Sequence, residues 1–430
     1  MKFAKINPQN AFLALIILQL FIFGVLNYLF IPTNAIRWII DTALYLSLAI
    51  MLIARYRIKG DAIAFLYVLL LLANVFSFFI NANDIVSFIK QVRFTLIGGA
   101  IYCLLYYSNF PRDFYVKAIK IIYIIGYCQL PLVIIQQLSY GFLSKFVLLP
   151  DFVDFASGTI GYGESGVLGC FLVFLAIAKI QYIIEYGASF KTNIQLLILL
   201  APIGLINSDA QYLFVPLIIA FAFLFNAKIN AKFVTFLIIA ILLLFSVNAI
   251  LSITWKGKKT ISGYTTGFIT KDLANPDLGL DQENRLLRYG SMYYVWASEK
   301  NNPSLFGKGP GYWLTRDSEG KEKSITSIWY HCNLILLTYG ELGIIGLILI
   351  IAIPAAAIFQ TNNTFLGKTV RLQSIYLLMI YFYVLPINNL SLCLEIMCFL
   401  AFYRKYFFKK YDIKTSTMTS FNTASAFSAW

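Results

Sequence analysis

Long apolar runs recur along the whole chain, and they restrict its fold more than any other feature of the sequence. Their lengths are close to the roughly 20 helical residues that cross the hydrocarbon core of a bilayer. Only 13% of the residues are charged, compared with roughly 25% in a typical soluble domain. The sequence lacks the short segments of alternating polarity that build an outer-membrane barrel. It therefore predicts an all-α integral membrane protein.

We expect about twelve transmembrane helices, each as long as a bilayer requires. The first apolar run, 11–31, is longer than the core of a signal peptide and has no small-x-small cleavage site after it, so we expect it to be retained as a helix. The expected helices cover residues 11–31, 36–54, 62–80, 93–110, 121–138, 166–183, 194–207, 212–226, 233–252, 341–359, 372–387 and 390–403.

The basic residues predict how these helices are oriented. If the N-terminus is cytoplasmic, the cytoplasmic segments carry 19 Lys and Arg residues, whereas the short outer connectors carry four. The other 11 of the 34 lie in segment 253–340, which is long enough to be translocated whatever its charge. The positive-inside rule therefore predicts that both termini are cytoplasmic. The four basic residues of the outer connectors are Arg37, Lys90, Arg93 and Lys145.

The expected helices divide the chain into four parts. Residues 1–252 would form helices one to nine, 253–340 a large periplasmic loop, 341–403 helices ten to twelve, and 404–430 a cytoplasmic tail without fixed structure. No internal repeat relates the first six helices to the last six, as a major-facilitator-type transporter would require. Five of the six cysteines lie in apolar runs, so neither a disulfide framework nor a metal site is expected.

The loop 253–340 contains most of the polar residues that could carry chemistry. We expect a helix over 281–300, on which Arg285 and Arg288 share a face and Tyr289 follows one turn after Arg285. Guanidinium groups bind phosphate through two parallel hydrogen bonds, which suits a diphosphate leaving group. A solvated helix face with ordinary surface ion pairs is the alternative interpretation.

A glycine-rich turn, 307–313, follows this helix in the sequence. Its glycines would let backbone amides approach a ligand. The aromatic residues Trp313, Trp329 and Tyr330 could stack on sugar rings, although aromatic residues also anchor proteins at membrane interfaces. The turn contributes three candidate binding residues, Lys308, Gly309 and Tyr312.

His331 is the only histidine in the chain, and we expect it at the membrane–water boundary, close to Trp329 and Asn333. A single histidine is more often structural than catalytic. At this position, however, a base that titrates near neutral pH would be useful for activating a hydroxyl group. His331 is therefore a candidate general base, with Trp329 and Asn333 as candidate substrate-binding residues.

Two further acidic residues stand out. Glu164 ends the glycine-containing segment 156–164 before the sixth expected helix, where it is either a general base or sugar ligand, or a solvated carboxylate at the start of a helix. Asp41 lies within the second expected helix, where a carboxylate is costly in lipid unless it is partnered. We therefore expect Asp41 to point inward, without a chemical role assigned to it.

In this order, the motifs resemble the O-antigen polymerase and O-antigen ligase family of bacterial surface-glycan assembly. Arg285-Leu286 followed by Tyr289 looks like the family's Arg-Leu-x-x-aromatic helix. Residues 302–311 are similar to its Pro-Leu-x-Gly-x-Gly turn, and 331–346 to its His-Asn segment followed by Glu-x-Gly-x-x-Gly. The family often has a Gly-rich turn where 156–164 lies. The connector 207–211 has no arginine where the family often has Ser-Arg-Gly, so Arg288 or Lys308 would supply that cation.

The resemblance implies a multi-pass glycosyltransferase of the bacterial inner membrane. It would use polyprenyl-diphosphate-linked oligosaccharide without a metal ion, a cofactor or a nucleic acid, together with a flippase and a chain-length regulator as partners. We expect a polymerase that transfers the glycan to a lipid-linked repeat unit. A ligase with a lipid A–core acceptor is the near alternative, and a transporter of lipid-linked sugar is the distant one. His331 and Arg285 would be the catalytic residues.

Overall fold

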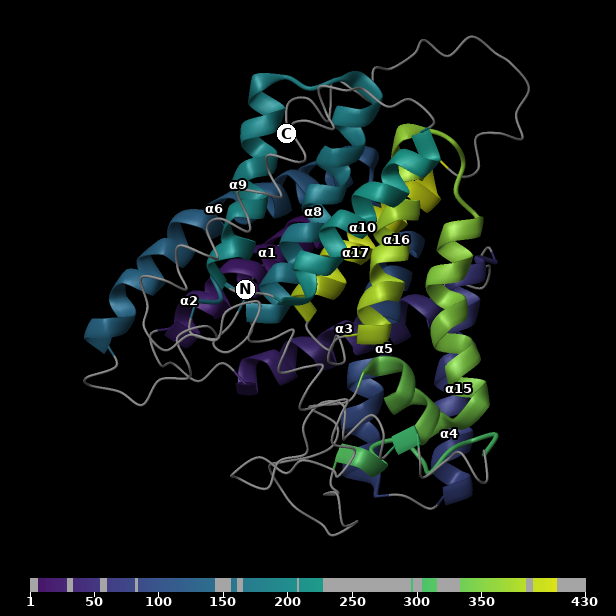
Figure 1. Ribbon diagram of the computed structural model, residues 1–430. Helices are drawn as coiled ribbons and strands as arrows, with labels where there is room; N and C mark the ends of the chain where they lie inside the picture. Colours follow the sequence, from purple (N-terminus) through teal and green to yellow (C-terminus); the bar gives the residue numbers. More distant parts are fainter. Residues whose placement is uncertain are drawn as a thin grey trace, which may run out of the picture.

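In the computed structural model, all the regular secondary structure of the described residues is helical (Figure 1). Five of its helices are long and apolar enough to cross a membrane, or six if the bent α5 is counted as one span. This confirms the prediction of a membrane-embedded helical protein. The ninth expected helix, 233–252, and most of the loop 253–340 lie outside the described residues. The described residues are 7–28, 34–54, 60–81, 84–143, 156–160, 165–206, 209–226, 295–296, 304–314, 333–383 and 390–407.

The helices follow the order expected from the sequence, but α5, α6, α15 and α16 begin seven to nine residues earlier than expected. α5 begins at Ile85 because the Asp84 carboxylate caps its first turn, accepting a hydrogen bond of 2.9 Å from the Ser87 amide. This hydrogen bond lowers the pKa of the Asp84 carboxyl. α15 begins at Leu334, because Asn333 caps it, rather than at residue 341. The elements are α1 Pro8–Ile17, η1 Leu18–Ile22, α2 Phe23–Tyr28, α3 Asn34–Ala54, α4 Ala62–Asn81, α5 Ile85–Tyr107, α6 Arg112–Leu143, α8 Ser165–Tyr186, α9 Phe190–Ile206, α10 Asp209–Asn226, η3 Tyr312–Leu314, α15 Leu334–Phe359, α16 Phe365–Tyr383 and α17 Leu390–Tyr406.

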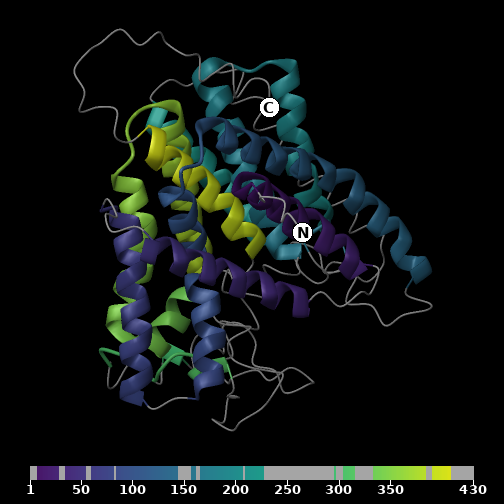
Figure 2. The same ribbon diagram turned by 180° about the vertical axis from the view of Figure 1, so that it is seen from behind.

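Helix α8 lies at the centre of one half of the bundle, where it contacts α9, α10 and α16. An apolar helix that is buried on nearly all its faces needs neighbours on every side. In the other half, α4 packs between α5 and α15, and Figure 2 shows these three helices side by side. The outer face of α4 exposes Phe65, Phe76 and Phe79. An apolar outer face of this kind suits contact with lipid.

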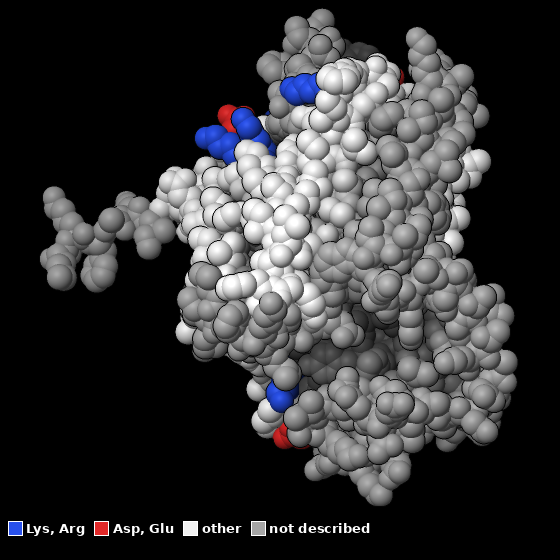
Figure 3. Space-filling view, turned by 60° about the vertical axis from the view of Figure 1, so that its left-hand side comes forward, with Lys and Arg blue, Asp and Glu red and all other residues white. Residues whose placement is uncertain are grey.

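The charged side chains lie toward the ends of the bundle. Figure 3 shows one face of the molecule, on which Lys, Arg, Asp and Glu side chains lie near two opposite ends with an uncharged surface between them. At one end, Arg404 of α17 donates to Asp61 Oδ1 from Nε at 3.0 Å and from a terminal nitrogen at 2.5 Å. Lys405 donates to the carbonyls of Ser108 and Phe110 between α5 and α6. Segments expected to be cytoplasmic therefore meet at one end.

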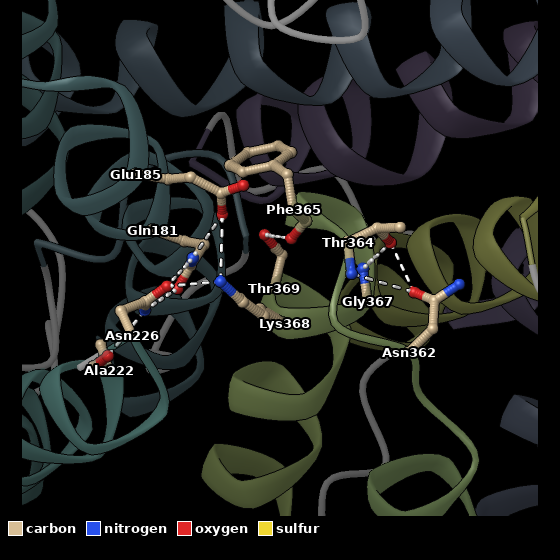
Figure 4. A network of polar contacts seen from close by, with 10 residues as sticks. All are labelled: Gln181, Glu185, Ala222, Asn226, Asn362, Thr364, Phe365, Gly367, Lys368 and Thr369. Carbon is tan, nitrogen blue, oxygen red and sulfur yellow. Dashed lines mark hydrogen bonds and ion pairs between the residues drawn. The ribbon is translucent and has the colours of Figure 1, made fainter. Parts of the chain in front are cut away.

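A second polar network joins three helices (Figure 4). Lys368 of α16 donates to Asn226 Oδ1 of α10 at 2.9 Å and lies 3.7 Å from Glu185 Oε2 of α8. Gln181 of α8 bonds both partners, at 3.1 Å to Glu185 and 3.0 Å to Asn226. These four side chains are linked to one another by hydrogen bonds and an ion pair. The network therefore fixes the positions of α8, α10 and α16 relative to one another at their shared end.

Candidate functional site

The candidate site is built around a break in α15. Gly343 has φ 67° and ψ −158°, so the helix is interrupted there, and Figure 1 shows α15 changing direction near its lower end. Leu334 and Ile350 lie on opposite sides of the break, yet both line the same small cavity. A straight helix would hold them about 24 Å apart. The segment before Gly343 therefore folds back toward the segment after it.

The glycine-rich turn satisfies the backbone groups that this break leaves without partners. The amides of Lys308 and Gly309 donate to the carbonyls of Gly340 and Glu341, at 3.0 and 2.9 Å. In the other direction, the carbonyl of Ser304 accepts from the amide of Ile344 at 3.1 Å. A helix end leaves backbone groups unpaired, and here the turn pairs them on both sides of the break. Two of the motifs noted in the sequence therefore form one structural unit.

This arrangement corrects one expectation. The sequence predicted that the amides around Lys308 and Gly309 would face a ligand, but both are hydrogen-bonded to α15. The glycines serve close packing instead: a Cβ on Gly307 would lie 2.4 Å from the carbonyl carbon of Glu341, and one on Gly346 would lie 2.2 Å from the Cβ of Leu342. The Glu-x-Gly-x-x-Gly pattern thus reflects a folded-back helix.

Helix α4 supports this unit through Ser77. The hydroxyl of Ser77 lies 2.5 Å from the carbonyl oxygen of Phe306 and 3.0 Å from that of Glu341. Ser77 was not among the residues predicted from the sequence. The spacing of Asn74, Ser77 and Asn81, which places three polar side chains on one face of an apolar helix, is a signal that could have identified it.

Glu341 is completely buried beneath the turn. Its carboxyl group lies near the backbone amides of Gly311 and Trp313, without reaching the geometry of a full hydrogen bond. A buried carboxyl group is costly unless polar groups surround it. The Glu341 carboxyl group therefore lies between the end of the first half of α15 and the aromatic part of the turn.

Lys308 contacts the two aromatic residues that follow it in the turn. Its Nζ lies 5.4 Å from the ring centroid of Tyr312 and 5.0 Å from that of Trp313. The Trp313 side chain is 2% exposed, and its ring packs edge-on against Tyr312 at 4.9 Å. Cation–π contacts of this kind hold an ammonium group over aromatic faces. The structure thus brings Lys308 and Tyr312 together, as a candidate binding pair requires.

Asn333 has a structural role. Its side-chain oxygen accepts from the Leu336 amide at 2.8 Å, capping α15, and its amide donates to the Phe382 carbonyl at 2.7 Å. Both ends of the side chain therefore bond within the protein. This cap fixes where the chain enters α15, two residues after His331 in the sequence.

The segment before α8 is partly described. Gly158 and Thr159 pair with side-chain amides of α6: the Gly158 amide donates to Gln136 Oε1 at 2.8 Å, and the Thr159 amide to Gln129 Oε1 at 2.9 Å. The Thr159 hydroxyl donates to the carbonyl of Leu20 at 2.6 Å, within the π-helix η1. The described part of this segment, 156–160, is buried, unlike a plain surface turn.

Several predicted residues fall outside the part of the chain that the structure describes. Within the described part, no three His, Cys, Asp or Glu side chains come together as metal ligands would. The predicted residues outside the described ranges are Glu164, Arg285, Arg288, Tyr289, Trp329 and His331.

The expectation for Asp41 is confirmed. The residue is 4% exposed, and its Oδ2 accepts a hydrogen bond from Arg93 Nε of α5. The Arg93 guanidinium also lies over the Trp38 ring, 4.1 Å from its centroid. An inward carboxylate with a cationic partner is the arrangement that a membrane interior requires.

Comparisons with known proteins add no name to this site. No protein family matches the chain, and no curated protein matches it.

Replacing Gly343 with alanine is expected to open the unit formed by the turn and α15. Its backbone conformation is one that glycine alone adopts easily, and an added Cβ would lie 2.3 Å from the Ser304 carbonyl oxygen. We expect a loss of about 1–3 kcal/mol of stability, measured as a lower thermal midpoint in detergent. Gly166→Ala is the matched control, because the space around Gly166 is open. Equal midpoints for the two variants would contradict this account.

Proposed function

We propose that this protein is a membrane glycosyltransferase that polymerises a surface polysaccharide from polyprenyl-diphosphate-linked repeat units. The observation that carries the proposal is that two of the three motifs, the glycine-rich turn and the Glu-x-Gly-x-x-Gly segment, are hydrogen-bonded to each other. The turn 304–313 and the segment 333–346 bond to each other and to Ser77 of α4, which lies 229 positions before Phe306 in the sequence. Lys308 and Tyr312 are held on this unit, with the buried ring of Trp313 packed against Tyr312, and in this proposal they supply a cation and an aromatic ring to a sugar phosphate.

The proposed orientation has about twelve spans in a bacterial inner membrane, both termini cytoplasmic and the large loop on the periplasmic side. Two structural facts support the sidedness. The segments with the most basic residues meet around Asp61 and Arg404. The turn 304–313 contacts α4 near Ser77, toward the opposite end of a helix about 30 Å long. The proposed active site and the basic segments therefore lie at opposite ends.

In the proposed reaction, the hydroxyl oxygen of the acceptor sugar attacks the anomeric carbon of the donor glycan. The bond from that carbon to the diphosphate oxygen breaks, and the diphosphate leaves with the electron pair. His331 would accept the proton of the hydroxyl group. Arg285, with Arg288, would stabilise the charge that develops on the diphosphate. The source of specificity for the sugar would be the aromatic residues, including Tyr289 and Trp329.

A strain deleted for the gene tests this proposal. Surface glycan from the strain, with and without a plasmid copy, is separated on a gel. We expect the ladder to collapse to core plus a single repeat unit and to return with the plasmid. A bare core with long polymer left on the lipid carrier would identify a ligase instead. An unchanged ladder would contradict both.

A transporter of lipid-linked sugar is a second candidate, and one observation favours it. Glu395 of α17 is completely buried, and neither of its carboxyl oxygens has a hydrogen-bond partner among the described residues. Ionisable side chains inside a bundle commonly mark transport pathways, as do interrupted helices such as α5 and α15. Purified protein in liposomes separates the two functions: a transporter moves labelled lipid-linked glycan across the bilayer, whereas a polymerase forms new glycosidic bonds.

A further inference from the structure

The helices α4, α5 and α15 carry buried oxygen atoms that have no hydrogen-bond partner among the described residues. Asn74 and Glu341 are 0% exposed, and Gln91 and Thr338 are 1% exposed. Nearly every buried polar atom in a folded protein has a partner. A group of exceptions on neighbouring helices therefore points to a ligand that completes it. The atoms are Asn74 Oδ1, Gln91 Oε1, Thr338 Oγ1, Glu341 Oε1 and Glu341 Oε2.

The three helices meet at the glycine-rich turn. The Ser77 hydroxyl of α4 lies 3.0 Å from the Glu341 carbonyl oxygen of α15, and the Gly309 amide of the turn donates to the same oxygen at 2.9 Å. The turn also touches α5, because a Cβ placed on Gly311 would lie 2.6 Å from the Ser87 carbonyl oxygen. The turn therefore contacts all three helices.

The same helices meet again at the small cavity beside the break in α15. Tyr67 of α4, Thr95 of α5, and Leu334 and Ile350 of α15 line this cavity. Helix α5 bends by 50° just before Thr95, and the Thr95 hydroxyl donates to the Gln91 carbonyl across the bend at 3.0 Å. The three helices are therefore held together at two levels, the turn and the cavity.

One polar residue of each helix lies between these two levels. Along its helix, each is one turn from a residue at the turn and one or two turns from a residue that lines the cavity. Positions three, four or seven apart lie on one face of a helix. The polar residues therefore share the faces on which the three helices meet. They are Asn74 between Tyr67 and Ser77, Gln91 between Ser87 and Thr95, and Thr338 between Leu334 and Glu341.

The oxygen atoms of this layer suit a cation. Amide, hydroxyl and carboxylate oxygens are the ligands of hard cations. Asn74 Nδ2 donates to the Leu70 carbonyl at 2.8 Å, so Oδ1 is the end of this side chain that lacks a partner. The carboxylate of Glu341 is the one charge among the four side chains of the layer. A single monovalent cation balances that charge.

Glu341 lies where a positive charge is needed. It is in the last turn before the break at Gly343, at the end of a helix where the dipole is negative. The Lys308 ammonium group lies over the rings of Tyr312 and Trp313, and neither Glu341 carboxylate oxygen has a hydrogen-bond partner in the described part of the chain. Buried carboxylates are paired or coordinate a metal ion.

From these observations we propose that a monovalent cation binds between α4, α5 and the first half of α15. Its ligands are the carboxylate of Glu341 and the side-chain oxygens of Asn74, Gln91 and Thr338. The cation neutralises the carboxylate and ties the folded-back segment to the other two helices. Interrupted helices coordinate Na+ in secondary transporters, and α5 and α15 are both interrupted. The site goes beyond the proposed function, because neither the donor nor the acceptor of that reaction takes part in it.

Thermal unfolding of the purified full-length protein in detergent tests the proposal. The midpoint is measured in sodium chloride, potassium chloride and choline chloride at one ionic strength. We expect a higher midpoint in at least one of the two alkali salts than in choline chloride. Above the dissociation constant, each tenfold rise in that cation should raise the ratio of folded to unfolded protein about tenfold.

Two variants locate the site. Glu341→Gln keeps the shape of the side chain but removes its charge, and we expect it to abolish the difference between the salts. Thr338→Val removes one neutral ligand and should weaken the apparent affinity for the cation about tenfold.

Each variant has a matched control. Glu395→Gln removes another completely buried carboxyl group whose oxygens have no hydrogen-bond partner among the described residues, on α17. Thr369→Val removes a buried hydroxyl group of α16 that already donates to the Phe365 carbonyl at 2.9 Å. Both controls should respond to the alkali cation as the wild type does.

Three results would overturn the proposal. Equal wild-type midpoints in the three salts would mean that the layer holds water or a neutral carboxylic acid. A full cation response in Glu341→Gln, or its loss in Glu395→Gln, would place the cation elsewhere. If Glu341→Gln fails to fold, the wild-type protein and Thr338→Val still decide, because an unchanged affinity in Thr338→Val also contradicts the site.

Discussion

Replacing His331 with alanine is expected to lower polymer formation about 100- to 10,000-fold, the contribution typical of a positioned general base. A sugar hydroxyl is a weak nucleophile, and the reaction proposed here needs a group that takes up its proton as the new bond forms. His331 is the only histidine in the chain, so no second imidazole can replace it. Asn333, two residues later in the sequence, caps the start of α15.

The measurement is the length and amount of surface polymer in cells that make the variant at the wild-type protein level. Gly166→Ala serves as the control for expression and insertion, since it changes a position with open space around it. Arg285→Lys is the companion variant: it keeps the charge but not the bidentate geometry, and we expect less polymer from it. Full polymer length and amount in His331→Ala would remove the general-base role.

Replacing Asp61 with alanine is expected to destabilise the folded protein by about 3–5 kcal/mol, because it leaves a buried charge without its partner. Asp61 and Arg404 have side-chain exposures of 1% and 5%. The same carboxylate accepts from the Tyr102 hydroxyl at 2.8 Å and from the amides of Ile63 and Ala64 at 3.1 and 3.2 Å. The substitution therefore removes an ion pair, a hydrogen bond and a helix cap together.

Asp84→Ala provides the comparison. Asp84 also caps a helix, but it is exposed, so loss of this cap costs far less than loss of the partner of a buried charge. Thermal midpoints in detergent, read by size-exclusion chromatography after heating, should therefore fall much further for Asp61→Ala than for Asp84→Ala. Similar shifts for the two variants would mean that the Asp61–Arg404 pair contributes little beyond capping.

The sequence determined the class of fold, the order of the helices and the inward position of Asp41. The length of an apolar run and its lack of charge are local properties of the sequence. Each run of sufficient length can therefore be recognised as a membrane-spanning helix independently of the others. The inward position of Asp41 followed from the cost of a carboxylate in lipid, although its partner, Arg93, had been assigned to an outer connector. That partner depends on how α3 and α5 pack, which no local pattern encodes.

Tertiary structure decided the form of the candidate site. The resemblance identified the Gly-Lys-Gly-Pro-Gly turn and the Glu-x-Gly-x-x-Gly segment as motifs, but the start of α15 at Leu334 and its break at Gly343 were not predicted. The break is stable because the turn 304–309 pairs the backbone groups on both of its sides. Those bonds join residues separated by tens of positions, and they use the amides that were expected to face a ligand. Apolar periodicity reports which side chains avoid water, whereas the partner of a backbone amide is set only when distant segments meet.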